Sequence, residues 1–223
     1  MEANQGSFGV GYRRLDLPIG VCIQRGWDLA TQNLGPLIGY ACVILAIHAG
    51  LSLIHIIGWI AGVVISPALS AGYFIYIRKR VRGEPAQFSD FFGGFDYLGQ
   101  LFLLGLVSGI LVFIGLLLCI LPGLYLIAGY MFASFLVIAR NLDFWQAMET
   151  SRKAVTDNLG SILVLLLALL GVNILGALAC LVGLIFTIPL TYCAGVVAFH
   201  MIFEEEAQAE TVPPPPAPGP IKI

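Results

Sequence analysis

The sequence predicts an all-α, polytopic membrane protein with six transmembrane helices, arranged as three hairpins with interfacial amphipathic helices. Composition is the first reason: of 223 residues, 59% are hydrophobic and 11% charged, whereas soluble domains carry about a quarter charged residues. Charge placement is the second. Three stretches of 49, 43 and 46 residues contain no Asp, Glu, Lys or Arg: 29–77, 97–139 and 158–203. One span needs about 20 apolar residues, so each stretch holds two.

The six spans follow from dividing each charge-free stretch in two. We expect the spans at residues 35–53, 55–77, 99–119, 122–139, 160–182 and 183–203. Pro67 and Pro189 fall inside spans, where each removes a backbone hydrogen bond and favours a kink. Pro122 and Gly123 are interpreted as the external turn between the third and fourth spans.

An amphipathic stretch precedes each hairpin. The first covers residues 18–34, the second 88–97, and the third 143–158 with Asn141 as its N-cap. We expect these stretches in the membrane interface, with four aromatic side chains at headgroup depth: Trp27, Phe91, Phe92 and Trp145. The alternative is that they are connecting helices packed against the bundle.

The basic residues predict the orientation. All eleven Lys and Arg residues lie outside the charge-free stretches, and cationic loops are retained in the cytoplasm. We therefore expect a multi-pass protein of the bacterial cytoplasmic (inner) membrane with both termini cytoplasmic and the first span as insertion signal. A cluster follows the second span directly: Arg78, Lys79, Arg80 and Arg82. It either attracts anionic lipid or only sets the topology.

The boundaries of the stretches repeat along the chain. Residues 31–35 read TQNLG, 156–160 read TDNLG, and 96–99 read DYLG, a weaker version. These patterns predict three repeats, 18–83, 84–140 and 141–203, within a membrane domain at 18–203; chance similarity of apolar segments is the alternative. A polar segment, 1–17, comes before it. Residues 204–223 form an acidic, proline-rich tail, which we expect to be disordered and cytoplasmic, as a linker or as a ligand of an SH3-like groove.

Catalytic patterns are missing from the sequence. The spans hold no carboxylate, Lys or Arg, which argues against ion-coupled transport and an aspartyl protease, and there is no His-Glu-x-x-His motif. His48 and His55 would lie about 10.5 Å apart along one helix, too far for one metal ion. We predict no enzyme, no cofactor and no metal site. The formal net charge of −2 argues against nucleic-acid binding.

Three polar residues inside the spans are candidates for a role in the membrane: His48, Ser108 and Asn173. Hydrogen bonding between helices is the simpler interpretation for His48 and Asn173. The sequence favours a non-enzymatic scaffold, accessory subunit or lipid-interacting protein, whose partners are membrane lipids, another membrane protein or a second copy of the chain. The alternative is a transporter or channel for a neutral or lipid-like solute, with Asn173 or Ser108 facing a polar cavity.

The third amphipathic stretch also carries a resemblance. Residues 143–152 read DFWQAMETSR, and Asn158-Leu159, Leu175-Gly176, Gly183 and Pro189-Leu190 follow. Over residues 88–203 this pattern resembles a group of uncharacterised bacterial multi-span proteins, akin to the membrane domain fused to some glycerophosphodiester phosphodiesterases. The resemblance implies a six-span helical domain in the inner membrane. It implies no activity, because the catalytic domain of those fusions has no counterpart here.

Overall fold

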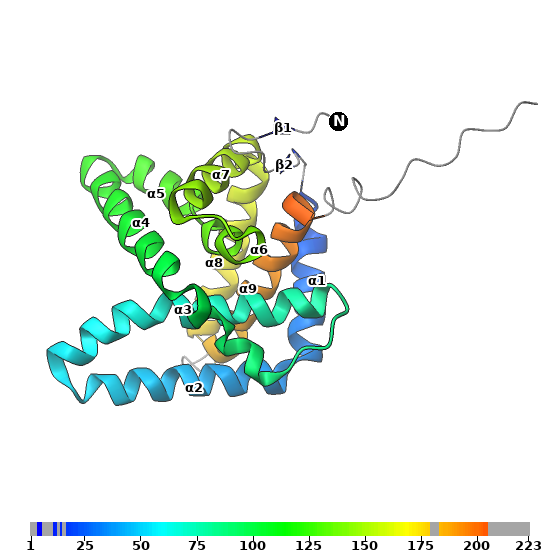
Figure 1. The fold of residues 1–223 in the computed structure, drawn as a ribbon. Helices are drawn as coiled ribbons and strands as arrows, with labels where there is room; N and C mark the ends of the chain where they lie inside the picture. Colours follow the sequence, from blue (N-terminus) through cyan, green and yellow to red (C-terminus); the bar gives the residue numbers. More distant parts are fainter. Residues whose placement is uncertain (1–3, 6–10, 13, 15–16, 179–182, 205–223) are drawn as a thin grey trace, which may run out of the picture.

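The protein is built almost entirely of helices. The computed structural model describes residues 4–5, 11–12, 14, 17–178 and 183–204 (Figure 1). Within these residues, six helices are long and apolar enough to cross a membrane, which is the number predicted by the charge-free stretches. One feature departs from an all-α fold: the two-residue strands β1 (Asn4–Gln5) and β2 (Gly11–Tyr12) pair in antiparallel fashion. The tail beyond residue 204 lies outside the described residues.

The helices follow one another with short connections. In chain order the elements are α1 (Ile19–Gln32), α2 (Leu34–Ser52), α3 (His55–Val81), the 3₁₀ helix η1 (Phe88–Tyr97), α4 (Leu98–Leu118), α5 (Ile120–Gly129), α6 (Ala133–Arg140), α7 (Phe144–Asp157), α8 (Leu159–Leu178), α9 (Leu184–Phe199) and the π-helical turn η2 (His200–Glu204).

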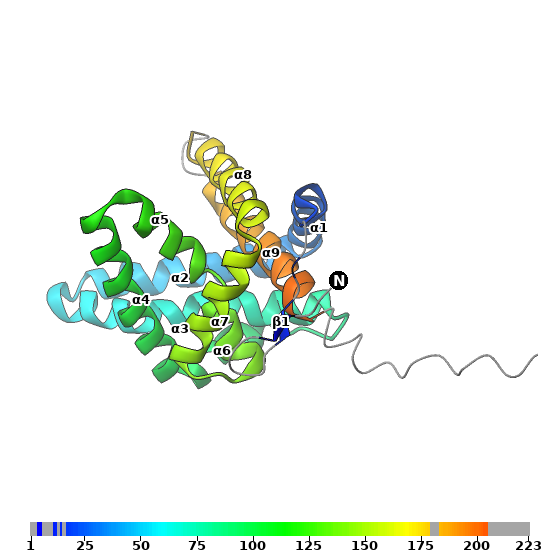
Figure 2. The ribbon, with the colours of Figure 1, turned by 90° about the horizontal axis from the view of Figure 1, so that it is seen from above.

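Three pairs of consecutive helices pack together: α2 with α3, α4 with α5, and α8 with α9. Figures 1 and 2 show that the pairs point in different directions from one region of the molecule. We call this region the hub. It consists of α1, η1 and α7 together with the C-terminal ends of α3, α6 and α9, and it holds most of the buried core.

Each hub helix packs against the second helix of another pair. α1 lies on α9, where a methyl group added to Gly26 would come within 2.9 Å of the Ala194 backbone. η1 lies on α3, where a side chain at Gly94 would collide with the Ala68 carbonyl. α7 lies on α5 and α6. The close approach of backbones explains why small residues stand at these crossings.

Three phenylalanines, one from each of α3, α6 and α9, meet at the centre of the hub. The Phe74 ring stacks on Phe135 with centroids 4.2 Å apart. Phe199 meets both rings edge-on, at 5.3 Å from Phe74 and 5.7 Å from Phe135. All three side chains are buried, so this cluster joins helices from three distant parts of the chain.

The same backbone break occurs before α2, α4 and α8. Asn33 has φ −121° and ψ 24°, Tyr97 has φ −107° and ψ 13°, and Asn158 has φ −117° and ψ 23°. The two asparagines are buried. Each amide donates to the carbonyl four residues earlier, Leu29 for Asn33 and Ala154 for Asn158. The TxNLG motifs therefore mark sharp changes of direction that their own asparagine side chains stabilise.

The fourth predicted span is not the continuous helix that we expected. Pro122 and Gly123 lie inside α5, and the turn falls at Cys119, whose backbone is extended (φ −170°, ψ 147°). The helix then stops at Gly129 and resumes at Ala133. The Ser151 hydroxyl of α7 enters this interruption, donates to the Gly129 carbonyl at 2.6 Å and accepts from the Phe132 N–H at 3.2 Å. A neighbouring side chain thus satisfies the backbone groups that the break exposes.

The N-cap of α7 was also predicted wrongly. Asp143 caps the helix, because its carboxylate accepts from the Gln146 N–H at 2.7 Å. Asn141 instead ends α6 with left-handed backbone angles (φ 52°), a conformation that asparagine tolerates better than most residues.

Candidate functional site

His48 takes part in a hydrogen-bond chain between α2 and α3. Its Nδ1 lies 2.9 Å from the Ile44 carbonyl and its Nε2 lies 3.0 Å from Ser66 Oγ. The Ser66 hydroxyl also lies 2.6 Å from the Gly62 carbonyl, one turn earlier. The polar atoms of His48 and Ser66 are therefore occupied within this helix pair.

Asn173 takes part in a corresponding hydrogen-bond chain between α8 and α9. Its amide donates to the Leu169 carbonyl at 2.8 Å and to Thr191 Oγ1 at 2.7 Å, and Thr191 donates to the Thr187 carbonyl at 2.8 Å. Each of the four positions stands 125 residues after its counterpart in α2 and α3. Ser108, the third intramembrane candidate, bonds to the Gly105 carbonyl of its own helix at 3.3 Å.

Each member of the basic cluster after the second span contacts another residue of the protein. Lys79 forms an ion pair with Asp90 of η1 at 2.7 Å, and Arg82 lies 3.8 Å from Glu84. The Arg80 Nε donates to the Asn33 side chain at 2.6 Å. The Arg78 guanidinium lies 5.8 Å from the centre of the Phe74 ring. These contacts tie the end of α3 into the hub.

Three of the four aromatic candidates are exposed, and one is not. Trp27 is 57%, Trp145 56% and Phe92 39% exposed. Phe91 is fully buried, which corrects the prediction that it meets lipid. Its ring stacks on Tyr40 and on Tyr76 with centroids 4.2 Å and 4.3 Å apart. The reason is that η1 packs on α3, so one side of the Phe-rich stretch becomes core.

A charge network joins three partly exposed side chains of α7. Glu149 binds Arg152 through two Nη contacts of 2.9 Å, and Lys153 lies 3.3 Å away. Burial acts to raise the pKa of Glu149, but the hydrogen bonds from Arg152 and Lys153 outweigh it and hold the pKa below its usual value. The sequence pattern of residues 143–152 indicated no role for Ser151, whose partners lie on α5 and just before α6. Among the described residues, no three His, Cys, Asp or Glu side chains gather as a metal site would require.

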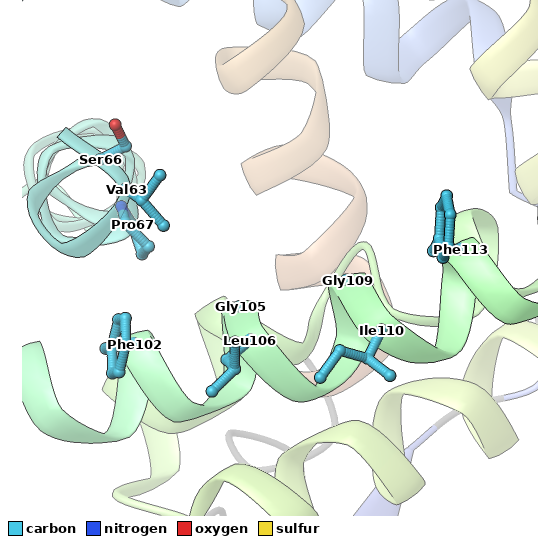
Figure 3. Close-up of a pocket in the computed structure, with 9 residues that line it drawn as sticks. All are labelled: Val63, Ser66, Pro67, Phe102, Gly105, Leu106, Gly109, Ile110 and Phe113. Atoms are coloured by element: carbon cyan, nitrogen blue, oxygen red, sulfur yellow. The ribbon is translucent and has the colours of Figure 1, made fainter. Parts of the chain in front are cut away.

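A groove of about 420 Å³ lies between α3 and α4. Figure 3 shows Val63 and Pro67 on α3 beside the stretch of α4 that carries Phe102, Leu106 and Ile110, which line the groove with them. Gly105 and Gly109 line it and make room on the α4 side. Ser66 supplies the one side-chain oxygen in the described lining, and His48 and Gly62 already engage it. The groove is therefore suited to an apolar occupant.

Together these features define a helical protein with six apolar helices in its described part, as expected of a membrane protein. The chain is similar to uncharacterised proteins of Mycobacterium bovis and Mycobacterium tuberculosis, at 27–28% identity over 171 residues that cover 75% of this chain. It spans about half (52%) of the length of these curated relatives. No family model and no solved structure matches. The resemblance to the phosphodiesterase-fused membrane domain therefore stays a prediction.

Proposed function

We propose that the protein is a non-enzymatic, lipid-interacting protein of the bacterial cytoplasmic membrane. In this proposal the hub lies at the cytoplasmic surface, and the three helix pairs enter the bilayer as hairpins that diverge from it. Lipid chains fill the spaces between the hairpins. The observation that carries the proposal is the apolar groove between α3 and α4.

The length of the groove fits one lipid chain. Its lining on α4 extends from Phe102 to Phe113, which is roughly 16 Å of helix at 1.5 Å per residue. This is about half of the roughly 30 Å hydrocarbon thickness, the depth of one leaflet. An acyl chain needs no hydrogen-bond partner. The one side-chain oxygen in the described lining, that of Ser66, is already hydrogen-bonded within the protein.

The hydrogen bonds of the polar side chains inside the helix pairs support lipid contact over transport. His48 and Asn173 bond across their own helix pairs, and Ser108 bonds within α4. A transport pathway for a polar solute needs such groups facing the solute. Many exposed residues of the helix pairs are large and apolar, among them Leu117, Leu121 and Leu178.

We also propose that segments 18–83, 84–140 and 141–203 are three versions of one hairpin unit, arranged in a closed ring. Three observations support this: the shared backbone break at Asn33, Tyr97 and Asn158, the hydrogen-bond chains 125 residues apart, and the Phe74, Phe135 and Phe199 cluster with one ring per segment. Each hub helix packs on the unit before it, and α1 on α9 closes the ring.

The lipid proposal is tested by filling the groove. Gly109→Leu adds a side chain where a Cβ meets nothing within 4 Å, and Gly171→Leu on α8 is a matched control with equally open space. Native mass spectrometry of the protein in mild detergent should show less retained lipid for Gly109→Leu only. Equal retention by both variants would contradict the proposal.

Two further results would replace the lipid-interacting function with another one. Solute flux in liposomes that requires Asn173 would establish transport instead. A stoichiometric copurifying protein that is lost when the chain is cut after Ala207 would establish an accessory subunit and give the tail its role.

A further inference from the structure

A second hollow lies at the hub, where α1 passes the ends of α3 and α9. It measures about 260 Å³. Arg25, Asp28 and Gln32 line it from α1, Arg80 from α3 and His200 from η2. The α1 residues are three and four positions apart, so they share one face of the helix.

Two arginines and one carboxylate give this hollow an excess of positive charge. The Arg80 Nε donates to Asn33 Oδ1 at 2.6 Å, which fixes the plane of the guanidinium. Among the described residues, no hydrogen bond or ion pair engages the Arg80 terminal nitrogens or the Arg25 guanidinium. Two guanidinium groups whose N–H donors no other described residue engages form a typical arrangement for binding phosphate oxygens.

The rest of the lining is apolar. Leu29, Val197 and Met201 form the remaining wall together with Val81. A soluble phosphate would gain nothing from this surface, whereas the glycerol and first carbons of a phospholipid would bury apolar area against it. Trp27, on α1 as well, is 57% exposed, as is usual for tryptophan at headgroup level.

We propose that this hollow binds the headgroup of an anionic phospholipid, with the phosphate held by Arg25 and Arg80. The Asp28 carboxylate accepts hydrogen bonds from headgroup hydroxyls and the Gln32 amide donates to them, which suits a phosphoglycerol group. Leu29, Val197 and Met201 contact the lipid below the phosphate. The inference rests on the proposed function, because it places lipid at a defined second site, separate from the groove between α3 and α4.

The test is lipid titration of the full-length protein in mild detergent, followed by native mass spectrometry. The probes are phosphatidylglycerol, phosphatidylcholine with the same acyl chains, and inorganic phosphate as competitor. Arg25→Gln is the main variant, because Arg25 has no described side-chain partner whose loss could unfold the protein. Arg14→Gln, which changes an exposed arginine, is the control.

We expect phosphatidylglycerol to bind at least tenfold more tightly than phosphatidylcholine, and Arg25→Gln to remove that preference while Arg14→Gln keeps it. Arg80→Lys, which keeps the charge and loses the planar fork, should weaken the preference too. Equal binding of both lipids, or unchanged preference in Arg25→Gln, overturns the inference. Competition by millimolar inorganic phosphate would also overturn it, in favour of a soluble ligand. If the inference fails while Gly109→Leu still reduces retained lipid, the proposed function stands.

Discussion

The rings of Phe74 and Phe135 stack 4.2 Å apart and nearly parallel, at an interplanar angle of 10°. Phe74 belongs to the first charge-free stretch and Phe135 to the second. The contact, together with Phe199, is where the helix pairs are joined. The helix pairs therefore meet in the hub, while their opposite ends diverge (Figures 1 and 2).

Removing a ring from this cluster should destabilise the whole protein. Phe135→Ala should lower the free energy of unfolding by about 3–5 kcal/mol, the usual cost of deleting a buried ring. Thermal unfolding in detergent, followed by circular dichroism, measures the change. Phe95→Ala is the control, since Phe95 is 39% exposed. A similar melting temperature for both variants would show that the cluster is not the centre of the fold.

Adding a single methyl group at the crossing of α1 and α9 should destabilise the protein. Gly26→Ala places its Cβ within 2.9 Å of the Ala194 backbone, and overpacking of this kind costs about 1–3 kcal/mol. Gly20→Ala, on the same helix with open space around it, should be neutral or stabilising because alanine favours helix. Opposite signs in the two melting temperatures are expected. A tolerated Gly26→Ala would mean that α1 does not approach α9 so closely.

Removing the small Ser151 hydroxyl should lower the stability of the protein. Ser151→Ala leaves the Gly129 carbonyl and the Phe132 N–H without their partner in a buried place, at a cost of about 1–3 kcal/mol. Limited proteolysis near residues 129–132 and the melting temperature both report the loss. Ser89→Ala, at an exposed serine, should leave both unchanged, and a silent Ser151→Ala would argue against the bridge.

Low pH should weaken the α7 network. The pKa of Glu149 is held below its ordinary value of 4.5, so the folded protein binds this proton more weakly than the unfolded chain does. Its contribution to stability is complete above about pH 4.5 and is lost as the pH falls through the lowered pKa. The melting temperature of Glu149→Gln should therefore fall less than that of wild type below pH 4.5. Glu84→Gln, whose carboxylate makes only a 3.8 Å contact, should follow wild type.

The ring proposal predicts that the chain tolerates circular permutation. A new N-terminus at Glu84, in an exposed loop, with a flexible linker from residue 203 to Ile19, keeps every hairpin intact. The Cys22 Sγ of α1 lies 3.8 Å from the Met201 Sδ of η2, so the two ends that the linker joins lie close together. The permuted chain should insert and melt near wild type, whereas a break within α2 at Tyr40 should not. Failure of the loop permutation would contradict the closed ring.

Local patterns in the sequence were enough to predict the number of apolar helices and to mark the TxNLG motifs as repeated boundaries, where the structure has changes of direction. Hydropathy is a property of consecutive residues, and an asparagine that bonds four residues back acts within its own turn. The same patterns failed at Phe91, whose neighbours Phe92 and Phe95 are exposed. Composition could not tell which side of that stretch packs on α3.

The sequence by itself determined that the chain is helical and apolar enough for a membrane, because the spacing of charges along the chain decides both. Only the tertiary structure decided that Ser151 fills the break after Gly129, that Phe74, Phe135 and Phe199 meet, and that Arg25 and Arg80 line one hollow. These residues are 22 to 125 positions apart. Contacts between such distant residues depend on how helices cross, and that depends on side-chain packing rather than on any local pattern.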